Sequence, residues 1–300
     1  MARNHIKSSL SSKIFDVLNY LFMLLLMVAM IYPFWNTFAV SLNDALDSIK
    51  GGIYLLPRKF TLYNYATMFS RGTLLDAAFI SVSKTLIVTI LNVFLSSLAA
   101  YVLSRKKFVF RKFMTIFLVL TMYVNAGLIP QFFLFQRLGL INKYWVYIVP
   151  NLIGAFNVIV IRTFMNGLPE SLAESARIDG AGEFRTFVQI IMPLCKPVLA
   201  TVALWVAVGT WNSWFDTFIF ASRYQKLSTL QYEMMKLLSS SMIQSGTVIP
   251  GLVGQTQSRV VTPTAIRAAM TIIAALPIIF VYPFLQKYFV QGLHLGSVKG

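Results

Sequence analysis

The chain has 300 residues, of which 57% are hydrophobic and 12% charged. Because roughly a quarter of the residues in a soluble protein are charged, this composition indicates a membrane protein that lies in a lipid bilayer. The formal net charge is +16, but no soluble basic face is available to hold phosphates, so we predict no nucleic-acid partner.

Cysteine and histidine are almost absent from the sequence. The single cysteine, Cys195, excludes an internal disulfide and a cysteine-based zinc site, and we interpret it as a small buried residue. The two histidines, His5 and His294, lie near the two ends of the chain. We therefore predict no catalytic residue, no metal site and no cofactor held by this chain itself.

Six stretches are long and apolar enough to cross a bilayer, since a transmembrane helix needs about 20 mostly apolar residues. The predicted spans are at about 14–40, 75–103, 108–136, 144–166, 192–221 and 265–290. We predict an all-α membrane protein with a single transmembrane domain over residues 1–300. The first stretch follows three basic residues, as a signal peptide does, but its apolar run is too long and no small-residue cleavage site follows. It is interpreted as a retained span.

The orientation is predicted from the basic residues that flank the spans. The short connection 104–112 contains five Lys or Arg and no acidic residue, so we place it in the cytoplasm. Six spans then put both termini and the connection 167–191 in the cytoplasm, and the loops 41–74, 137–143 and 222–264 outside. The first of these loops is expected to pack a short amphipathic segment on the membrane face.

Several residues inside the spans are candidates for a substrate pathway. Asn125 and Gly127 interrupt the third span, and Asn157 lies in the fourth. Broken helices line cavities in transporters, but glycine is also ordinary in membrane helices, so packing is the favoured interpretation of Gly127. Asn125 and Asn157 are candidate pathway residues, with packing as an equal alternative for Asn157. Lys84 is expected to extend its amine to the membrane surface, with a role in the pathway as the alternative. Arg162 is expected to anchor the cytoplasmic end of its span with Glu170 in reach.

The segment 168–193 is too polar to span the bilayer, and it predicts two short helices, at about 170–180 and 183–191. A proline and glutamates near the start are typical of a helix N-terminus, and Asp179-Gly180 is typical of a helix end. A helix lying on the bilayer would have a lysine-rich polar face, whereas acidic residues here match or outnumber basic ones. We interpret the segment as a protein-docking surface with small residues and apolar anchors.

The same segment carries a motif. The run Glu174-Ser175-Ala176, followed by Asp179-Gly180-Ala181 and by Phe187, Ile190 and Pro193, resembles the EAA motif in permease subunits of binding-protein-dependent ABC importers. A serine stands at position 175 where the motif has alanine. Since the two side chains have similar volumes, we expect docking to be unchanged.

Other runs resemble the carbohydrate-uptake branch of that family, in its maltose-permease-like class. They are Gly127-Leu128-Ile129-Pro130, Ile161-Arg162-Thr163-Phe164, the stretch from Trp211 to Asp216 and the ending Gly296-Ser297-Val298-Lys299-Gly300. The stretch 51–57 with Asn64-Tyr65 resembles the LplC-like and YtcP-like sugar permeases of Gram-positive bacteria.

This resemblance implies the type I ABC importer permease fold, with a cytoplasmic coupling helix, in the cell membrane of a Gram-positive bacterium. The implied partners are a second homologous permease, two ABC ATPase subunits that bind ATP and Mg²⁺, an extracellular solute-binding protein and a carbohydrate, expected to be an oligosaccharide. The chain has no GxxxxGK[ST] phosphate loop, so we expect a non-catalytic subunit. The candidate ATPase-coupling residues are Glu174, Ser175, Ala176, Asp179, Gly180, Phe184, Phe187 and Pro193.

The outer half of the fifth span completes the candidate substrate pathway with Trp211, Asn212, Trp214 and Asp216. Aromatic faces stack well on sugar rings, and Asn212 and Asp216 would share a helix face. The alternative is an interfacial aromatic belt with Asp216 already in water.

The external loop 222–264 would, by the same resemblance, enter the sugar cleft of the binding protein with 246–254 as its tip, and a solvated cap is the alternative. The carboxyl-terminal tail would reach the ATPase interface. Outer basic residues such as Lys50 and Arg58 would suit an acidic oligosaccharide, lipid headgroups or an acidic face of the binding protein. A stand-alone channel or secondary carrier is the alternative function, and a membrane-embedded enzyme is disfavoured because the spans lack a cluster of ionisable groups.

Overall fold

The computed structural model of the protein describes residues 10–70, 72–245 and 262–297. Regular structure in these ranges is helical, and strand-like pairing is limited to one isolated bridge between Asn43 and Phe60. The all-α class is therefore confirmed. Three helices are long and apolar enough to cross a membrane, and three further spans result if each bent helix pair counts as one. Five of the six predicted stretches match these elements closely, whereas the fifth, at 192–221, only overlaps the bent pair from Glu183 to Asn212.

The chain divides into two compact units. Unit 1 comprises Met1–Ser70 and Leu238–Ile273, and unit 2 comprises Arg71–Leu237 and Ala274–Gly300. Two helices, α13 (Leu230–Ser245) and α14 (Pro263–Ser297), continue from one unit into the other.

Unit 1 begins with the long helix α1 (Leu10–Ser41), followed by the short helices α2 (Ala45–Ile49) and α3 (Tyr63–Phe69). The most apolar part of α1 buries none of its residues within the chain. A helix that is apolar all round needs lipid or another protein around it. The long exposed helix therefore suits a chain that lies in a membrane and has partners there.

The loop between α1 and α3 is held by polar side chains. Buried Asn43 donates to Asp47 Oδ2 at 3.1 Å and accepts from the backbone N–H of Lys59 at 2.7 Å. Arg58 pairs with the same carboxylate at 3.0 Å and also donates to Gly51 O. Arg58 is thus engaged inside its own loop, although its side chain stays 45% exposed, so its expected contact with lipid headgroups, a binding protein or an acidic sugar stays a prediction.

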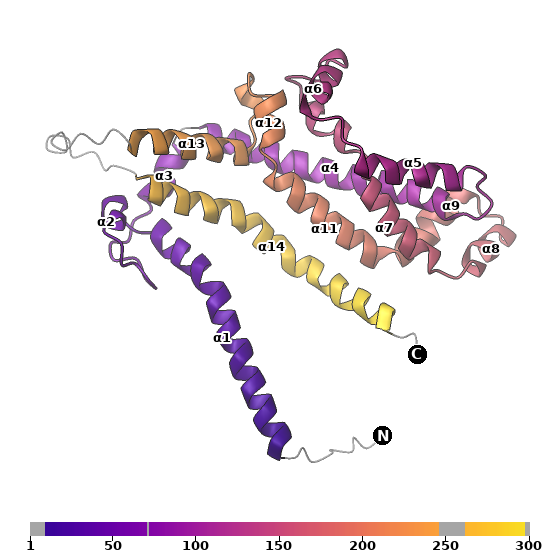
Figure 1. Cartoon of the computed structure of the whole chain (residues 1–300), viewed down its shortest axis with the longest axis horizontal. Coiled ribbons are helices and arrows are strands. Elements are labelled where there is room, and N and C mark those ends of the chain that lie inside the picture. Colours follow the sequence, from indigo (N-terminus) through magenta and orange to yellow (C-terminus); the bar gives the residue numbers. More distant parts are fainter. Residues whose placement is uncertain (1–9, 71, 246–261, 298–300) are drawn as a thin grey trace. The chain divides into compact units, whose positions relative to one another are not determined.

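Unit 2 contains most of the helices, and Figure 1 labels most of its α-helices. In chain order they are α4 (Thr73–Ser104), α5 (Arg111–Tyr123), α6 (Leu128–Arg137), the 3₁₀ turns η1 (Tyr144–Tyr147) and η2 (Val149–Asn151), α7 (Ala155–Asn166), α8 (Ser171–Ile178), α9 (Glu183–Thr186), the π-helical turn η3 (Phe187–Ile191), α10 (Met192–Leu194), α11 (Lys196–Asn212), α12 (Phe215–Phe220) and the 3₁₀ turn η4 (Gln225–Leu227).

The helix α4 has an inverted distribution of polar and apolar residues. Its buried positions recur every three or four residues and include Ser81, Lys84, Asn92 and Ser96, whereas large apolar side chains such as Phe79 are exposed. In a bilayer the exposed surface is apolar, while polar groups and small residues gather between helices. The pattern explains why α4 forms the centre of unit 2.

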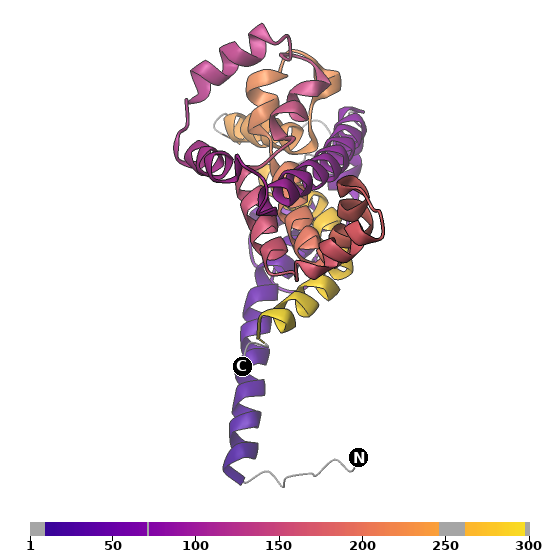
Figure 2. The same cartoon turned by 90° about the vertical axis from the view of Figure 1, so that its right-hand side faces the viewer.

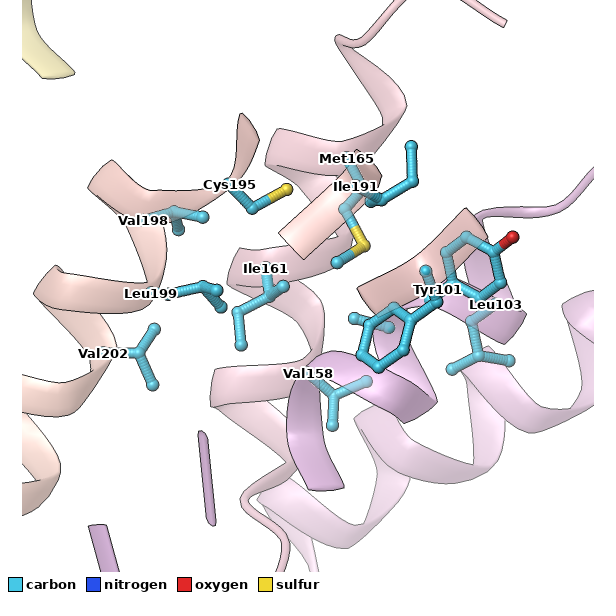
Figure 3. Close-up of a cluster of buried hydrophobic side chains, with 12 residues drawn as sticks. Tyr101, Leu103, Val158, Ile161, Met165, Ile191, Cys195, Val198, Leu199 and Val202 are labelled. Atoms are coloured by element: carbon cyan, nitrogen blue, oxygen red, sulfur yellow. The ribbon is translucent and has the colours of Figure 1, made fainter. Parts of the chain in front are cut away.

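Helices α7 and α11 pack against α4. Figure 3 shows the cluster that joins them, in which Ile161 of α7 lies beside Leu199 of α11 and Val158 lies on the side of Tyr101 of α4. Cys195 lies in this cluster and is fully buried, as predicted. Because lipid tails are as apolar as these side chains, close van der Waals packing rather than transfer from water holds such helices together.

Three of the predicted spans are bent. Helix α6 is bent by 117° against α5, and Figures 1 and 2 show the sharp change of direction between the two helices. The break lies at Gly127, which has φ +86° and ψ 173°. Close packing does not require a glycine at this position, since an added Cβ would meet nothing within 4 Å. Only glycine adopts this backbone region readily. The packing interpretation of Gly127 is therefore wrong, and its role is conformational.

The fifth predicted span is divided twice. The segment Glu183–Leu194 bends by 82° against Lys196–Asn212, and the extended backbone of Ser213 (ψ 123°) then separates α11 from α12. Asn212 and Asp216 consequently belong to different helices. The expectation that they share one helix face is wrong because the i, i+4 relation holds only in a continuous helix.

Candidate functional site

The helix α8 ends where the sequence predicts, at Asp179-Gly180. Gly180 has φ +77°, the left-handed conformation that glycine adopts without strain. The N–H of Gly180 donates to Arg177 O at 3.0 Å, and the N–H of Ala181 donates to Ala176 O at 2.8 Å. These two bonds form a Schellman motif, which satisfies carbonyls at the helix end. The tight turn brings α9 directly after α8.

The segment from α8 to α10 has an inner face that packs within the chain. Ala173 and Ala176 of α8 are buried, as is Thr186, and the ring of Phe187 is fully buried. The Phe187 ring centroid lies 5.2 Å from that of Tyr101 in α4. Ala176 and Phe187, which the sequence groups with the docking residues, thus support the surface from beneath instead of forming it.

The opposite face of this segment is exposed. It presents all the remaining candidate coupling residues, together with Ile178, which the sequence analysis missed and whose side chain is 86% exposed. The exposed candidates are Glu174, Ser175, Asp179, Gly180, Phe184 and Pro193. Two large apolar side chains, Ile178 and Phe184, therefore stand next to carboxylates on a surface of small residues. Exposed apolar groups with a polar surround are typical of protein-docking sites.

Glu183 connects this surface to the transmembrane helices. Its Oε2 accepts a hydrogen bond from the Tyr101 hydroxyl at 2.6 Å, and its Oε1 accepts one from Arg177 Nε at 2.8 Å. The Arg105 guanidinium lies 4.0 Å from the centre of the Tyr101 ring. One carboxylate therefore links Arg177 of α8 to Tyr101 near the end of α4. The partner of Glu183 is 82 residues away in sequence, and no local pattern predicts such a contact.

The beginning of α8 is held by a second ion pair. Lys106 Nζ donates to Glu170 Oε2 at 2.6 Å, and this bond lowers the pKa of Glu170 below its ordinary value. Both side chains are well exposed, so water screens the pair. Arg162 instead donates to Thr115 Oγ1 at 2.7 Å, which corrects the expectation that it anchors near Glu170.

A buried ion pair lies at the break between α11 and α12. Lys84 Nζ is 2.7 Å from Asp216 Oδ2 and 2.6 Å from Ser213 Oγ, and it lies 4.7 Å from the centre of the Tyr147 ring. The Lys84 side chain is only 1% exposed. The expectation that Lys84 extends to the membrane surface is therefore wrong, because Asp216 and the Tyr147 ring hold its charge inside unit 2.

Asp216 also lines a cavity of about 300 Å³ in unit 2. Polar groups and aromatic rings share its wall, and Lys84 neutralises its carboxylate. The lining residues are Leu128, Gln131, Phe135, Val146, Pro150, Asn151, Gly209, Thr210, Ser213, Phe215, Asp216 and Phe220. A ring-shaped ligand with many hydroxyl groups, each of which can donate and accept hydrogen bonds, matches such a wall.

The other candidate pathway residues lie outside this wall. Trp211 is buried and donates to Ala274 O at 3.0 Å, whereas Asn212 is exposed and accepts from Gln231 at 3.2 Å. Trp214 packs against its aromatic neighbours Phe215 and Phe218. These contacts give Trp211 a structural role and leave Trp214 beside the cavity residue Phe215.

The two asparagine candidates have separate environments. Asn157 is buried, donates to Asn92 Oδ1 at 2.7 Å and accepts from Trp205 Nε1 at 2.8 Å. This network joins α4, α7 and α11, so the packing alternative accounts for Asn157. Asn125 is exposed and its side chain accepts from the N–H of Gly127 at 2.9 Å, which stabilises the turn before α6.

The loop 222–264, which is predicted to be external, contains more structure than the sequence indicates. The helix α13 begins at Leu230, and Leu230, Glu233 and Met234 are buried. The expected tip at 246–254 and the end of the tail at 298–300 lie outside the described residues. No group of three or more His, Cys, Asp or Glu side chains gathers in a metal-binding arrangement within the described ranges.

Comparison with known proteins gives consistent matches along the chain. Residues 92–295 match the family "Binding-protein-dependent transport system inner membrane component". The polygalacturonan/rhamnogalacturonan transport system permease protein YtcP of Bacillus subtilis (strain 168) is 33% identical over 97% of this chain and 100% of its own length. Protein LplC of the same strain is 34% identical over 97% of this chain and 96% of its own length.

A solved structure resembles the fold over nearly the whole chain. It is described as a bacterial ABC transporter involved in the import of the acidic polysaccharide alginate. The matched chain is 25% identical, and the TM-score is 0.81 with 94% of this chain and 99% of that chain covered. The resemblance to the LplC-like and YtcP-like subgroup, which the motifs indicate, is confirmed by these comparisons.

Proposed function

Because the chain belongs to the family of binding-protein-dependent transport system inner membrane components, we propose that it is one of two homologous transmembrane subunits of an ABC importer. Within that family it belongs to the carbohydrate permeases of the LplC-like and YtcP-like subgroup. The proposed solute is therefore an oligosaccharide, and the proposed location is a Gram-positive cell membrane. Two ATPase subunits would bind ATP and Mg²⁺, and an extracellular solute-binding protein would deliver the sugar. The chain itself would perform no chemistry.

The exposed face of α8 and α9 is the surface that we assign to the ATPase. The observation that carries this assignment is the division of the segment into an exposed face and a buried one. Glu174 and Phe184 are open to a partner, whereas Phe187 is fixed in the core against Tyr101. A surface built in this way would transmit a push from the ATPase to α4, through the Phe187 ring and through Glu183.

The cavity at Asp216 is the part of the pathway that we assign to this subunit. Gln131, Thr210 and Ser213 offer hydrogen-bonding groups for sugar hydroxyls, and Phe135 and Phe215 offer aromatic surface. The charge of Asp216 is balanced by Lys84 at 2.7 Å, so a neutral sugar would not have to neutralise a lone carboxylate. Asp216 would hold the wall in place and Thr210 with Gln131 would contact the solute.

Co-purification tests the proposed assembly. A tagged chain should come out of its native membrane with a second permease and an ATPase, and ATP hydrolysis by that assembly should rise when the binding protein and its sugar are added. A chain that purifies alone and carries solute without ATP would contradict the proposal and favour the channel or secondary carrier.

The assigned pathway is tested by transport kinetics. Thr210→Val and Gln131→Ala should raise KM for oligosaccharide uptake several-fold while assembly stays intact, because each removes a hydrogen-bonding group from the cavity wall. Thr163→Val is the matched control, since Thr163 is an exposed threonine of α7 whose hydroxyl donates to Ile159 O of its own helix. Uptake unchanged in both cavity variants would exclude this cavity from the pathway.

The chemical class of the oligosaccharide is tested with the intact assembly. Uronate-containing oligosaccharides are the first candidates, because the similar YtcP protein is named for polygalacturonan and rhamnogalacturonan transport and the similar solved structure for alginate import. Neutral arabino- and maltodextrin oligosaccharides are the comparison, since permeases named for them are also similar. The sugar that stimulates ATP hydrolysis identifies the class.

A further inference from the structure

A second cavity of unit 2 has a strongly basic lining. It has a volume of about 380 Å³ and lies where α4 and α7 end and where α5 and α8 begin. Its lining residues are Ser104, Arg105, Lys106, Arg111, Met165, Asn166, Leu168, Pro169, Glu170 and Ile191. Three cations and one carboxylate therefore share one hollow.

The protein balances the charge of this hollow only in part: Arg105 lies near the carboxylates of Glu170 and Glu183 and stacks on the Tyr101 ring. Glu170 accepts from Lys106 at 2.6 Å, and the structure shows no carboxylate within ion-pair distance of Arg105 or Arg111 in the described ranges. The Nε atom of Arg105 is buried and has no hydrogen-bond partner in the described part of the chain. A buried unsatisfied donor is costly unless a bound group accepts from it.

The position of the cavity favours a lipid over a soluble anion. Arg105 directly follows α4, a 32-residue apolar helix, so the cavity lies at the end of a membrane span. Three large apolar side chains next to Arg111 in sequence are exposed: Val109, Phe110 and Phe113. Exposed apolar groups beside the cations provide surface for acyl chains, which a free phosphate does not have.

We propose that this basic cavity binds the headgroup of an anionic phospholipid. The lipid phosphate would accept hydrogen bonds from Arg105 and Arg111, and its acyl chains would lie along the exposed apolar residues at the start of α5. Basic hollows between transmembrane helices bind such headgroups on the cytoplasmic side of membranes. Lys106 would contact the same phosphate and Glu170, so a bound lipid would also touch the start of α8. This inference does not depend on which solute is carried.

Lipid binding to the full-length chain, with whatever subunits purify with it, tests the proposal. Native mass spectrometry during a titration with short-chain phosphatidylglycerol should show one saturable site, and phosphatidylcholine of the same chain length should not fill it. Each lost cation should weaken binding about fivefold, and Arg105→Gln/Arg111→Gln about 25-fold. Lys112→Gln is the matched control, because it removes a charge from the same connection but does not line the cavity.

Three results would overturn the proposal. Equal binding of phosphatidylglycerol by the wild type and the double variant would place the lipid elsewhere. Equal filling by phosphatidylcholine would show that the headgroup charge is irrelevant. Competition by inorganic phosphate at the same concentration would reassign the cavity to a free phosphate. Since Arg105 also packs on Tyr101, the single variants Arg111→Gln and Lys106→Gln give the same decision if the double variant does not assemble.

Discussion

Removal of the Lys84 ammonium should destabilise the packed helices of unit 2. In Lys84→Met, Asp216 loses a partner at 2.7 Å and keeps a side chain that is 21% exposed. At an effective dielectric constant of about 20, two unit charges at this distance attract each other by about 6 kcal/mol. Desolvation of both ions offsets part of this attraction. We expect the free energy of unfolding to fall by about 3 kcal/mol, which is the lower end of the loss for a broken buried pair. The loss is this small because Asp216 still accepts hydrogen bonds from the Ser213 hydroxyl and the Thr217 N–H.

The double variant Lys84→Met/Asp216→Asn separates the charge interaction from packing. The free energy of unfolding of both single variants and the double variant is measured by denaturant titration in detergent. The double variant should be more stable than the sum of the single losses by about 2 kcal/mol, because it leaves no unpaired charge in the interior. Losses that add to within about 0.5 kcal/mol would refute the reasoning, as would a Lys84→Met variant with wild-type stability.

Three further predictions concern other parts of the chain. Phe187→Ala should cost about 3–5 kcal/mol of unfolding free energy because the ring is fully buried. Phe184→Ala should leave the unfolding free energy almost unchanged and weaken ATPase binding. Equal stability losses in the two variants would contradict the division of the segment from α8 to α10 into a buried and an exposed face. The pKa of Asp47 is lowered by the hydrogen bond from Asn43 and by Arg58. The ionised carboxylate of Asp47 therefore contributes to stability above about pH 4, and this contribution is lost as the pH falls further. The melting temperature measured against pH should show this loss in the wild type but not in Asp47→Asn. Gly127→Ala should cost about 1–3 kcal/mol, which thermal unfolding measures, and no loss would mean that the break before α6 is not strained.

Local patterns predict the helices and the end of α8. The apolar stretches are long enough to be recognised individually, and Asp179-Gly180 specifies a helix end through the backbone freedom of one glycine. The resemblance of the segment 174–193 to a known motif indicates the candidate coupling surface. It does not tell which residues face outward, because the burial of Ala176 and Phe187 depends on packing within unit 2.

Long-range contacts are what the sequence does not reveal. The partner of Lys84 is 132 residues away, and a lone lysine in an apolar stretch is equally consistent with an amine that reaches the membrane surface. The break at Ser213 has no proline or glycine beside it, so no local signal separates α11 from α12. The helix α13 is missed because its polar residues resemble those of a loop, although Leu230 and Met234 are buried.

The central claim is that an ATPase drives this subunit through the exposed face of α8, and sugar-stimulated ATP hydrolysis by the purified assembly tests it most directly. Glu174→Lys reverses a charge at the centre of that face, and Asp76→Lys reverses an exposed charge in the first turn of α4 as the matched control. The account predicts at least a tenfold smaller stimulation for Glu174→Lys and an unchanged one for Asp76→Lys, with all subunits present in both. Full stimulation in Glu174→Lys would contradict the account.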